Sequence, residues 1–338
     1  MLRALRRSRG ILAHAGRAPA PRLAPSRGAA SINFVDIQGL SIHNLVGPEK
    51  LQAYDDSIIA ILSHEDASFS LLNELVVEAD GKCGIVYALL ALEHLRYSTH
   101  LTKAAKAAGK VASLASCLRN LERLAAANKL TSREKFFAAA ALAWSKGACS
   151  KAALLLESSL LTHPADIVAL RLMQDAYIAA GDSKSVLSCV ARHLLFFDER
   201  HHLHGFVLGM LTQGLVENGK YAEAEEAGVR ALERTRGDDV WGMHALMNTY
   251  LMCGKSSEAT EVYDKYHDKH RSSSQTFILY SRGVALLQRG NYSGAIKQYD
   301  AIVRLVKGDG DYHKALYTKY ANVLLWNICV SANTTPLP

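Results

Sequence analysis

Three histidines gather in the segment His201-His202-x-His204, where they could bind a metal ion such as zinc. Neighbouring residues on a helix point in different directions, and no cysteine or carboxylate cluster completes a coordination shell around these imidazoles. We therefore expect no metal site here and interpret the segment as a polar loop between two repeats.

Other patterns that could support catalysis are weaker still. The Asp55-Asp56 pair and the His64-Glu65-Asp66 run have the character of solvated helix faces and ends. The sequence contains no phosphate-binding loop, no HExxH motif and no Gly-x-Ser-x-Gly motif. We therefore predict no catalytic residues and no cofactor, and we keep a divergent enzyme that uses His244 as an alternative.

Glycine recurs at nearly constant spacing among the elements that would position any site. Gly147, Gly181, Gly219, Gly254 and Gly290 lie 34, 38, 35 and 36 residues apart. This is close to the period of the tetratricopeptide repeat (TPR), in which about 34 residues form two antiparallel helices with a glycine at the turn. The turn favours glycine because its left-handed backbone costs a residue with a Cβ roughly 1 kcal/mol or more.

Small and aromatic residues follow these glycines at fixed offsets. After Gly219 come Tyr221, Ala224 and Ala231, at positions where the two helices cross and a larger side chain would hold them apart. The unit that turns at Gly181 is the most degenerate. The pattern predicts an all-α fold, a TPR-like α-solenoid of antiparallel helix pairs, with five repeats over residues 131–309.

The segments on either side of the repeats have a different character. Residues 31–47 are apolar without a helical period, which predicts an extended N-terminal arm that lies on the protein's own first helices or adds to a partner. Helices predicted at 48–63, 68–79, 84–97 and 103–127 form an N-terminal helical segment, 48–130. Residues 310–338 are interpreted as a C-terminal helix and tail.

Residues 1–30 contain seven arginines and no acidic residue, which is typical of a mitochondrial presequence. A disordered basic tail is the alternative. Without these arginines, 32 basic residues face 32 acidic residues, so the net charge of +7 belongs to the presequence. A neutral mature protein argues against bulk phosphate binding, which depends on clustered lysine and arginine.

No apolar run approaches the roughly 18 residues that a membrane-spanning helix needs. The run at 85–92, for example, has eight residues. We therefore expect a protein that is not integral to a membrane.

Several motifs within the repeats resemble one particular family. They are His163-Pro-Ala-Asp166, Asp175-Ala-Tyr177, Trp241-x-x-His244 and Gly290-x-Tyr292. Over residues 130–305 the chain is similar to the tetratricopeptide repeat protein 38 family. The resemblance implies an all-helical repeat protein without an established reaction, and thus a fold more than a function.

The chain also departs from the pattern of that family. Members typically place histidines where this sequence has Gln174, Asn248 and Ser281, and a tryptophan where it has Tyr280. If those histidines serve a reaction, this chain has lost most of it.

A solenoid of helix pairs leaves a concave groove lined by the first helix of each pair, which is the usual place for a partner segment. Aromatic residues and arginine are typical anchors of such contacts. The residues predicted to line this groove and bind a partner are Trp144, Arg171, Asp175, Phe206, Gln213, Trp241, His244, Asn248 and Tyr280. The alternative is that several of them pack against the next repeat.

The last helix, predicted at about 312–330, carries apolar residues around more than one face. A terminal helix of a repeat array needs a polar outer side, so this excess indicates an interface. The residues predicted to contact a partner there are Tyr320, Leu324, Leu325, Trp326 and Ile328. Alternatively, the tail or a neighbouring helix covers them.

Together these patterns predict a mitochondrial scaffold that binds other proteins, in the matrix or peripheral to the inner membrane. It would be a structural subunit of a large assembly such as a respiratory complex, ATP synthase or ribosome. An RNA-binding helical-repeat protein is the first alternative, because such arrays have a similar period, and a divergent enzyme is the second.

Overall fold

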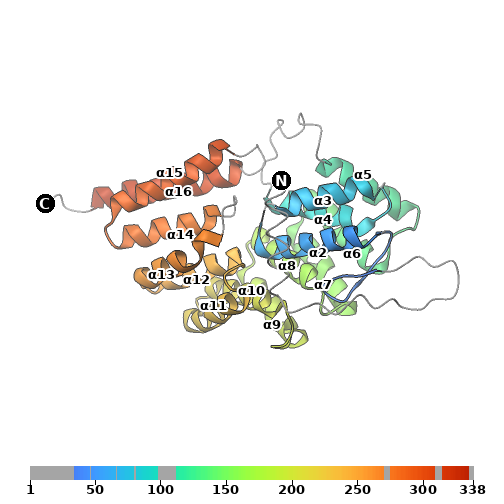
Figure 1. Cartoon of the computed structure of the whole chain (residues 1–338), viewed down its shortest axis with the longest axis horizontal. Coiled ribbons are helices and arrows are strands. Elements are labelled where there is room, and N and C mark those ends of the chain that lie inside the picture. Colours follow the sequence, from blue (N-terminus) through green and yellow to red (C-terminus); the bar gives the residue numbers. More distant parts are fainter. Residues whose placement is uncertain are drawn as a thin grey trace.

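The computed structural model describes residues 34–45, 47–65, 67–79, 81–97, 112–269, 275–308 and 314–334. Over these residues the protein is an all-α solenoid of antiparallel helix pairs, as predicted (Figure 1). The predicted presequence, 1–30, lies outside the described residues, as do residues 103–111 of the helix predicted at 103–127.

Five helix pairs span residues 132–308. They are α6 (Ser132–Ser145) with α7 (Cys149–Thr162), α8 (Ile167–Ala180) with α9 (Ser183–His193), α10 (His204–Glu217) with α11 (Tyr221–Thr235), α12 (Val240–Met252) with α13 (Ser256–Tyr266), and α14 (Gln275–Gln288) with α15 (Tyr292–Gly308). Short 3-10 turns, η1 (Leu194–Phe196) and η2 (His267–Lys269), follow α9 and α13. Among the first helices, α12 packs on α10 and α14 packs on α12, whereas α8 packs mainly on α7.

The five predicted glycines all stand at the turns within these pairs, with φ between +70° and +79°. At each turn the residue after the glycine donates its backbone N–H to the carbonyl five residues before it, as Lys220 does to Leu215 (3.0 Å). A Cβ built on any of the five would meet no atom within 4 Å. The left-handed dihedral, and not lack of room, therefore requires glycine there.

Alanine occupies the helix crossings. Ala224 on α11 is fully buried, whereas Ala222, two residues earlier, is exposed. Ala152, Ala259 and Ala295 are buried at the corresponding positions of other pairs. The register predicted from the glycine spacing is thus confirmed.

Among the described residues, four helices precede the pairs: α2 (Pro48–Ser63), α3 (Ala67–Glu78), α4 (Gly84–Tyr97) and α5 (Leu114–Ala126). Of the helix predicted at about 103–127, the part described is α5, which begins at Leu114 because Ser113 caps it by accepting a hydrogen bond from the Ser116 N–H (3.2 Å). A serine in this role ends helical pairing on its N-terminal side.

The N-terminal arm is a short hairpin of β1 (Phe34–Val35) and β2 (Ser41–Ile42), and not a simple extended segment. Ile42 and Leu45 are buried, and the Gln38 side-chain oxygen accepts a hydrogen bond from the Val168 N–H at the start of α8 (3.3 Å). The arm therefore lies on the protein's own helices, which was one of the two predicted alternatives.

This contact also corrects the interpretation of the acidic pair on α2 as a solvated face. Asp55 accepts a hydrogen bond from the Ile37 N–H of the arm (2.8 Å). Asp56 is buried and accepts one from Gln52 on its own helix (2.9 Å).

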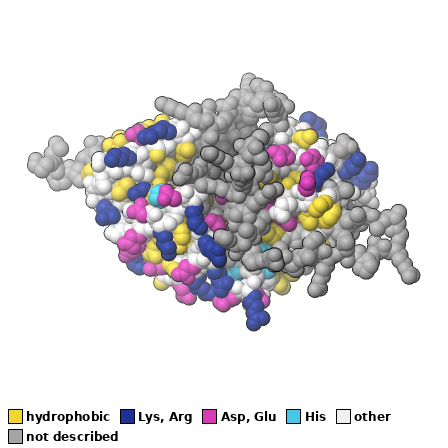
Figure 2. All heavy atoms as spheres, in the orientation of Figure 1, with side chains coloured by type: hydrophobic (Ala, Val, Ile, Leu, Met, Phe, Trp, Pro, Cys, Tyr) yellow, Lys and Arg dark blue, Asp and Glu magenta, His cyan; other side chains and the backbone are white. Residues whose placement is uncertain are grey.

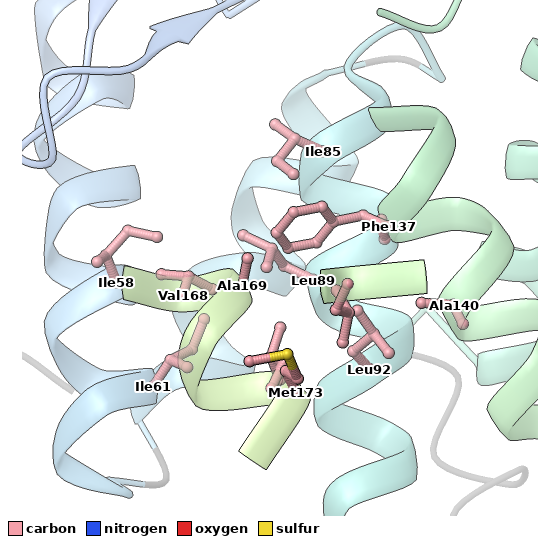
Figure 3. Packing of buried hydrophobic residues seen from close by; sticks show 14 of the residues in the cluster. Ile58, Ile61, Ile85, Leu89, Leu92, Phe137, Ala140, Val168, Ala169 and Met173 are labelled. Carbon is pink, nitrogen blue, oxygen red and sulfur yellow. The ribbon is translucent and has the colours of Figure 1, made fainter. Parts of the chain in front are cut away.

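The N-terminal helices close over the first repeats. Figure 3 shows Ile58 and Ile61 of α2 facing Val168 and Met173 of α8, with side chains of α4 and α6 beside them. These residues belong to one large apolar cluster that extends from Ile42 to Met210, and a second cluster extends from Leu232 to Ile328. The concave side of the early repeats is therefore covered by the chain itself.

The last helix, α16 (Lys314–Thr334), packs against α14 and α15 at the end of the array (Figure 1). None of the described helices combines the length and the apolar character that crossing a membrane requires.

Candidate functional site

The residues predicted to line the concave groove all lie on the first helices of the pairs, but most of them are buried. Arg171 is 1% exposed, and Gln213, His244, Phe206 and Trp144 are buried as well. The half-buried members are Asp175, Trp241, Asn248 and Tyr280. The set is therefore not an open groove in this structure, because the N-terminal helices contact it.

A chain of buried ion pairs joins α4 to α8. The Arg96 Nε lies 2.7 Å from Asp175 Oδ2, and Arg171 Nη2 lies 2.6 Å from Asp175 Oδ1. Arg96 also pairs with Glu93, whose other oxygen accepts a hydrogen bond from Ser68 (2.8 Å). Two cations and two carboxylates thus neutralise one another, so Arg171 and Asp175 are already used within the protein.

His64 extends this network to α12. Its ring stacks on the indole of Trp241, with centroids 4.8 Å apart and planes 17° apart, and its Nε2 lies 2.8 Å from Arg96 Nη2. The Arg171 guanidinium also lies over the Trp241 ring, with its central carbon 5.4 Å from the ring centroid. The prediction that His64 is solvated was wrong, because it ends α2 in a left-handed conformation and is buried.

The protonation state of His64 follows from this environment. Burial, together with the charges of Arg171 and Arg96, holds the pKa of His64 well below its usual value. The ring is therefore neutral at pH 7 and accepts a hydrogen bond from Arg96 without adding a third positive charge.

His244, Asn248 and Ser281 form a closed ring of hydrogen bonds between α12 and α14. His244 Nδ1 lies 2.9 Å from Ser281 Oγ, Ser281 donates to Asn248 Oδ1 (3.1 Å), and Asn248 Nδ2 lies 3.1 Å from His244 Nε2. The pattern is satisfied when His244 carries its proton on Nδ1 and Nε2 accepts from Asn248. Burial lowers the pKa of His244 to about 4.

This ring has a chemical consequence. A histidine that activates a serine accepts the hydroxyl proton, whereas here His244 donates to Ser281 and its second nitrogen is occupied by Asn248. Ser281 is also fully buried. The arrangement stabilises the packing of α12 on α14, and catalysis by His244 would require the ring to open.

A buried acid holds the start of α12. Asp239 accepts a hydrogen bond from the Gly242 N–H (2.9 Å), and burial raises its pKa to about 7. A Cβ on Gly209 would lie 1.9 Å from Asp239 Oδ2, so the glycine on α10 makes room for this carboxyl group. The acid serves as a helix cap and is enclosed by the two helices.

No family model matches this chain. The resemblance to the tetratricopeptide repeat protein 38 family therefore stays an expectation based on the motifs quoted above. Asn248 and Ser281, two of the positions where the resemblance implies histidine, are the direct hydrogen-bond partners of His244 in this chain.

Five residues of the buried contacts described above were not among the predicted site residues. They are His64, Glu93, Arg96, Phe277 and Ser281. Phe277 stands at the same offset from its turn glycine as Trp241, and their rings meet edge to face 5.0 Å apart, so the repeat frame could have included it. Ser281 lies on α14 within the repeats, whereas His64, at the end of α2, and Glu93 and Arg96, on α4, lie outside the repeats and carry no such signal.

The predicted C-terminal surface divides into two faces of α16. Leu324 and Ile328 were expected to contact a partner, but they point inward and are buried against α14 and its neighbours. Tyr320 is half-buried, with its ring 5.1 Å from that of Phe277 and 5.2 Å from that of Tyr280. These three residues therefore belong to the end of the core.

The opposite side of α16 faces outward. Trp326 is 70% exposed, and Val323, Leu325 and Val330 are between 39% and 43% exposed. Beside Val330 lies a hollow of about 320 Å³ between α14 and α16. It is lined by Val284, Leu287, Gln288, Asn327, Val330 and Ser331. Large apolar side chains next to such a hollow are typical of a protein interface.

Proposed function

We propose that this protein is a mitochondrial scaffold of the TPR type, without a catalytic site, that docks another protein chain on the outward face of α16. The observation that carries the proposal is the exposure of Trp326 on the outward face of α16, next to other exposed apolar side chains. Tryptophan is among the residues that contribute most to binding when a partner buries them.

The concave side, where a repeat array usually binds a partner segment, is less suited to this role here. Helices α2 and α4 already contact Asp175 and Trp241 there, so a partner segment would have to displace a buried ion-pair network. Displacing it would leave charges such as Glu93 unpaired, which is costly. A partner gains more by covering the exposed end of the array.

Charge distribution favours a protein partner over a nucleic acid. Figure 2 shows lysine and arginine side chains interspersed with aspartate and glutamate over the described part of the molecular surface in that view. Nucleic-acid affinity depends on cations gathered in one patch. The mitochondrial location in this proposal comes from the arginine-rich, acid-free residues 1–30.

Affinity purification of the tagged protein from isolated mitochondria tests this function. We expect co-purifying proteins that are lost from Trp326→Glu, because a buried carboxylate at the interface would have no partner. Leu161→Glu is the matched control, since Leu161 is 81% exposed at the end of α7, far along the chain from α16.

Three results would contradict the proposal. The first is the same set of co-purifying proteins with Trp326→Glu as with the unaltered protein. The second is RNA as the main bound component. The third is a tagged protein that does not enter mitochondria.

A further inference from the structure

The outward face of α16 combines a protruding side chain with an empty space one turn away. Trp326 is 70% exposed, and the hollow is lined by Asn327 and Val330, which come one and four residues later on the same helix. Val284 and Leu287 of α14 and Val330 of α16 give the hollow an apolar part, beside the polar side chains of its lining. One molecule thus carries both an anchor and a site of the kind that anchors fill.

The charge pattern restricts what can cover this face. Residues 320–338 contain no lysine, arginine, aspartate or glutamate. In α16 the charged residues are Lys314 and Lys319, both near its start. A partner surface with charged side chains near Trp326 would find no opposite charges there. Burying those charges would cost the free energy of their desolvation without compensation. The same face of another copy meets this requirement.

A two-fold symmetric dimer could place Trp326 of each copy in the hollow of the other. A two-fold axis that passes α16 between Trp326 and Val330 would set two copies of the helix antiparallel. Residue 326 of each copy would then lie opposite residue 330 of the other. Each Trp326 side chain would then reach the hollow of the other copy, so the same contact would form twice, as an interface between identical surfaces requires. The lysines near the start of each helix would lie at opposite ends of the pair.

We propose that the chain docked on the outward face of α16 is a second copy of this protein. The two α16 helices are antiparallel, and Trp326 of each copy fills the hollow between α14 and α16 of the other. This inference rests on the proposed function, because it names the partner at the same surface.

Light scattering coupled to size-exclusion chromatography of the purified full-length chain tests the proposal. We expect the mass of two chains for the unaltered protein and the mass of one chain for Trp326→Glu, with at least a tenfold rise in the dissociation constant. Leu161→Glu is the matched control, because it puts the same charge on an apolar side chain that is 81% exposed on α7, outside the proposed interface. It should keep the mass of two chains, and circular dichroism should show equal helix content in all three proteins.

Each remaining outcome overturns the inference. A single-chain mass for the unaltered protein over a wide concentration range excludes the second copy, as does a dimer that survives Trp326→Glu or is lost equally with Leu161→Glu. If the protein is a monomer but Trp326→Glu still loses co-purifying proteins, the partner is a different chain and the proposed function stands. If it is a monomer and that set is unchanged, both the inference and the proposed function fail.

Discussion

His244 shows how one residue can look catalytic in the sequence and be structural in the fold. Its two ring nitrogens are occupied by Ser281 and Asn248, and its buried position favours the neutral ring. An unfolded chain returns this histidine to water, where its pKa is about 6.5. The difference between the two states makes folding depend on pH.

We expect stability to fall as the pH drops from about 6.5 toward 4, in part because of His244. The pKa of the folded ring is lowered to about 4, so in this window the unfolded state binds a proton that the folded state does not. A full proton changes the free energy of unfolding by about 1.4 kcal/mol per pH unit. Denaturant unfolding at pH 7, 6 and 5 should show a shallower loss in His244→Gln than in the unaltered protein. Identical slopes would mean that His244 is not held neutral by the fold.

At the scale of the helix pair, the sequence contains nearly all the information that the structure uses. A left-handed turn admits few residues besides glycine, and a close crossing admits few besides alanine, so Gly219 and Ala224 report local geometry directly. These rules depend on nearest neighbours along the chain. They explain why the five turns and the register could be predicted.

Elements whose limits depend on distant contacts were predicted less well. The faces of α16 could not be assigned, because apolar residues surround the helix and only the positions of α14 and α15 decide that Leu324 is buried and Trp326 exposed. The arm was predicted to be extended, whereas Asp36 forms a turn by accepting hydrogen bonds from the Gln38 and Leu40 N–H groups (both 2.9 Å).

The register of α11 gives a test at this scale. Ala224→Trp places a large side chain in a fully buried crossing, and we expect it to lower the free energy of unfolding by about 1–3 kcal/mol or more. Ala222→Trp, two residues away on the exposed side, should change it by less than about 0.5 kcal/mol. Thermal or denaturant melts of the two variants make the comparison, and equal losses would show that the helix is rotated from the position described.

Over the whole molecule, the main departure from expectation is the contact between the N-terminal helices and the concave side of the repeats. His64 and Trp241 are separated by 177 residues, and Arg96 and Asp175 by 79. No periodicity links such positions, and an isolated arginine or histidine on a helix gives no sign of a distant partner. A solenoid that looked open from its repeats is therefore closed by helices that do not belong to them.

Arg96 is the residue on which this closure depends most. It contacts Glu93, Asp175 and His64, and its Nη1 lies 3.4 Å from the Ile61 carbonyl in the last turn of α2. Arg96→Met keeps much of the side-chain volume but leaves two carboxylates without their shared cation. Breaking a buried ion pair in this way costs about 3–5 kcal/mol.

We therefore expect Arg96→Met to loosen the N-terminal helices before the rest of the array. Amide hydrogen exchange should accelerate in the last turn of α2 and near Asp175 on α8, while α14, which belongs to the second apolar cluster, changes little. Arg192→Met is the matched control. Arg192 pairs with Glu157 on the outer surface with its side chain half exposed, and such pairs contribute about 1 kcal/mol or less. If the two variants show the same exchange pattern, the concave network does not hold the N-terminal helices, and the groove is open to a partner after all.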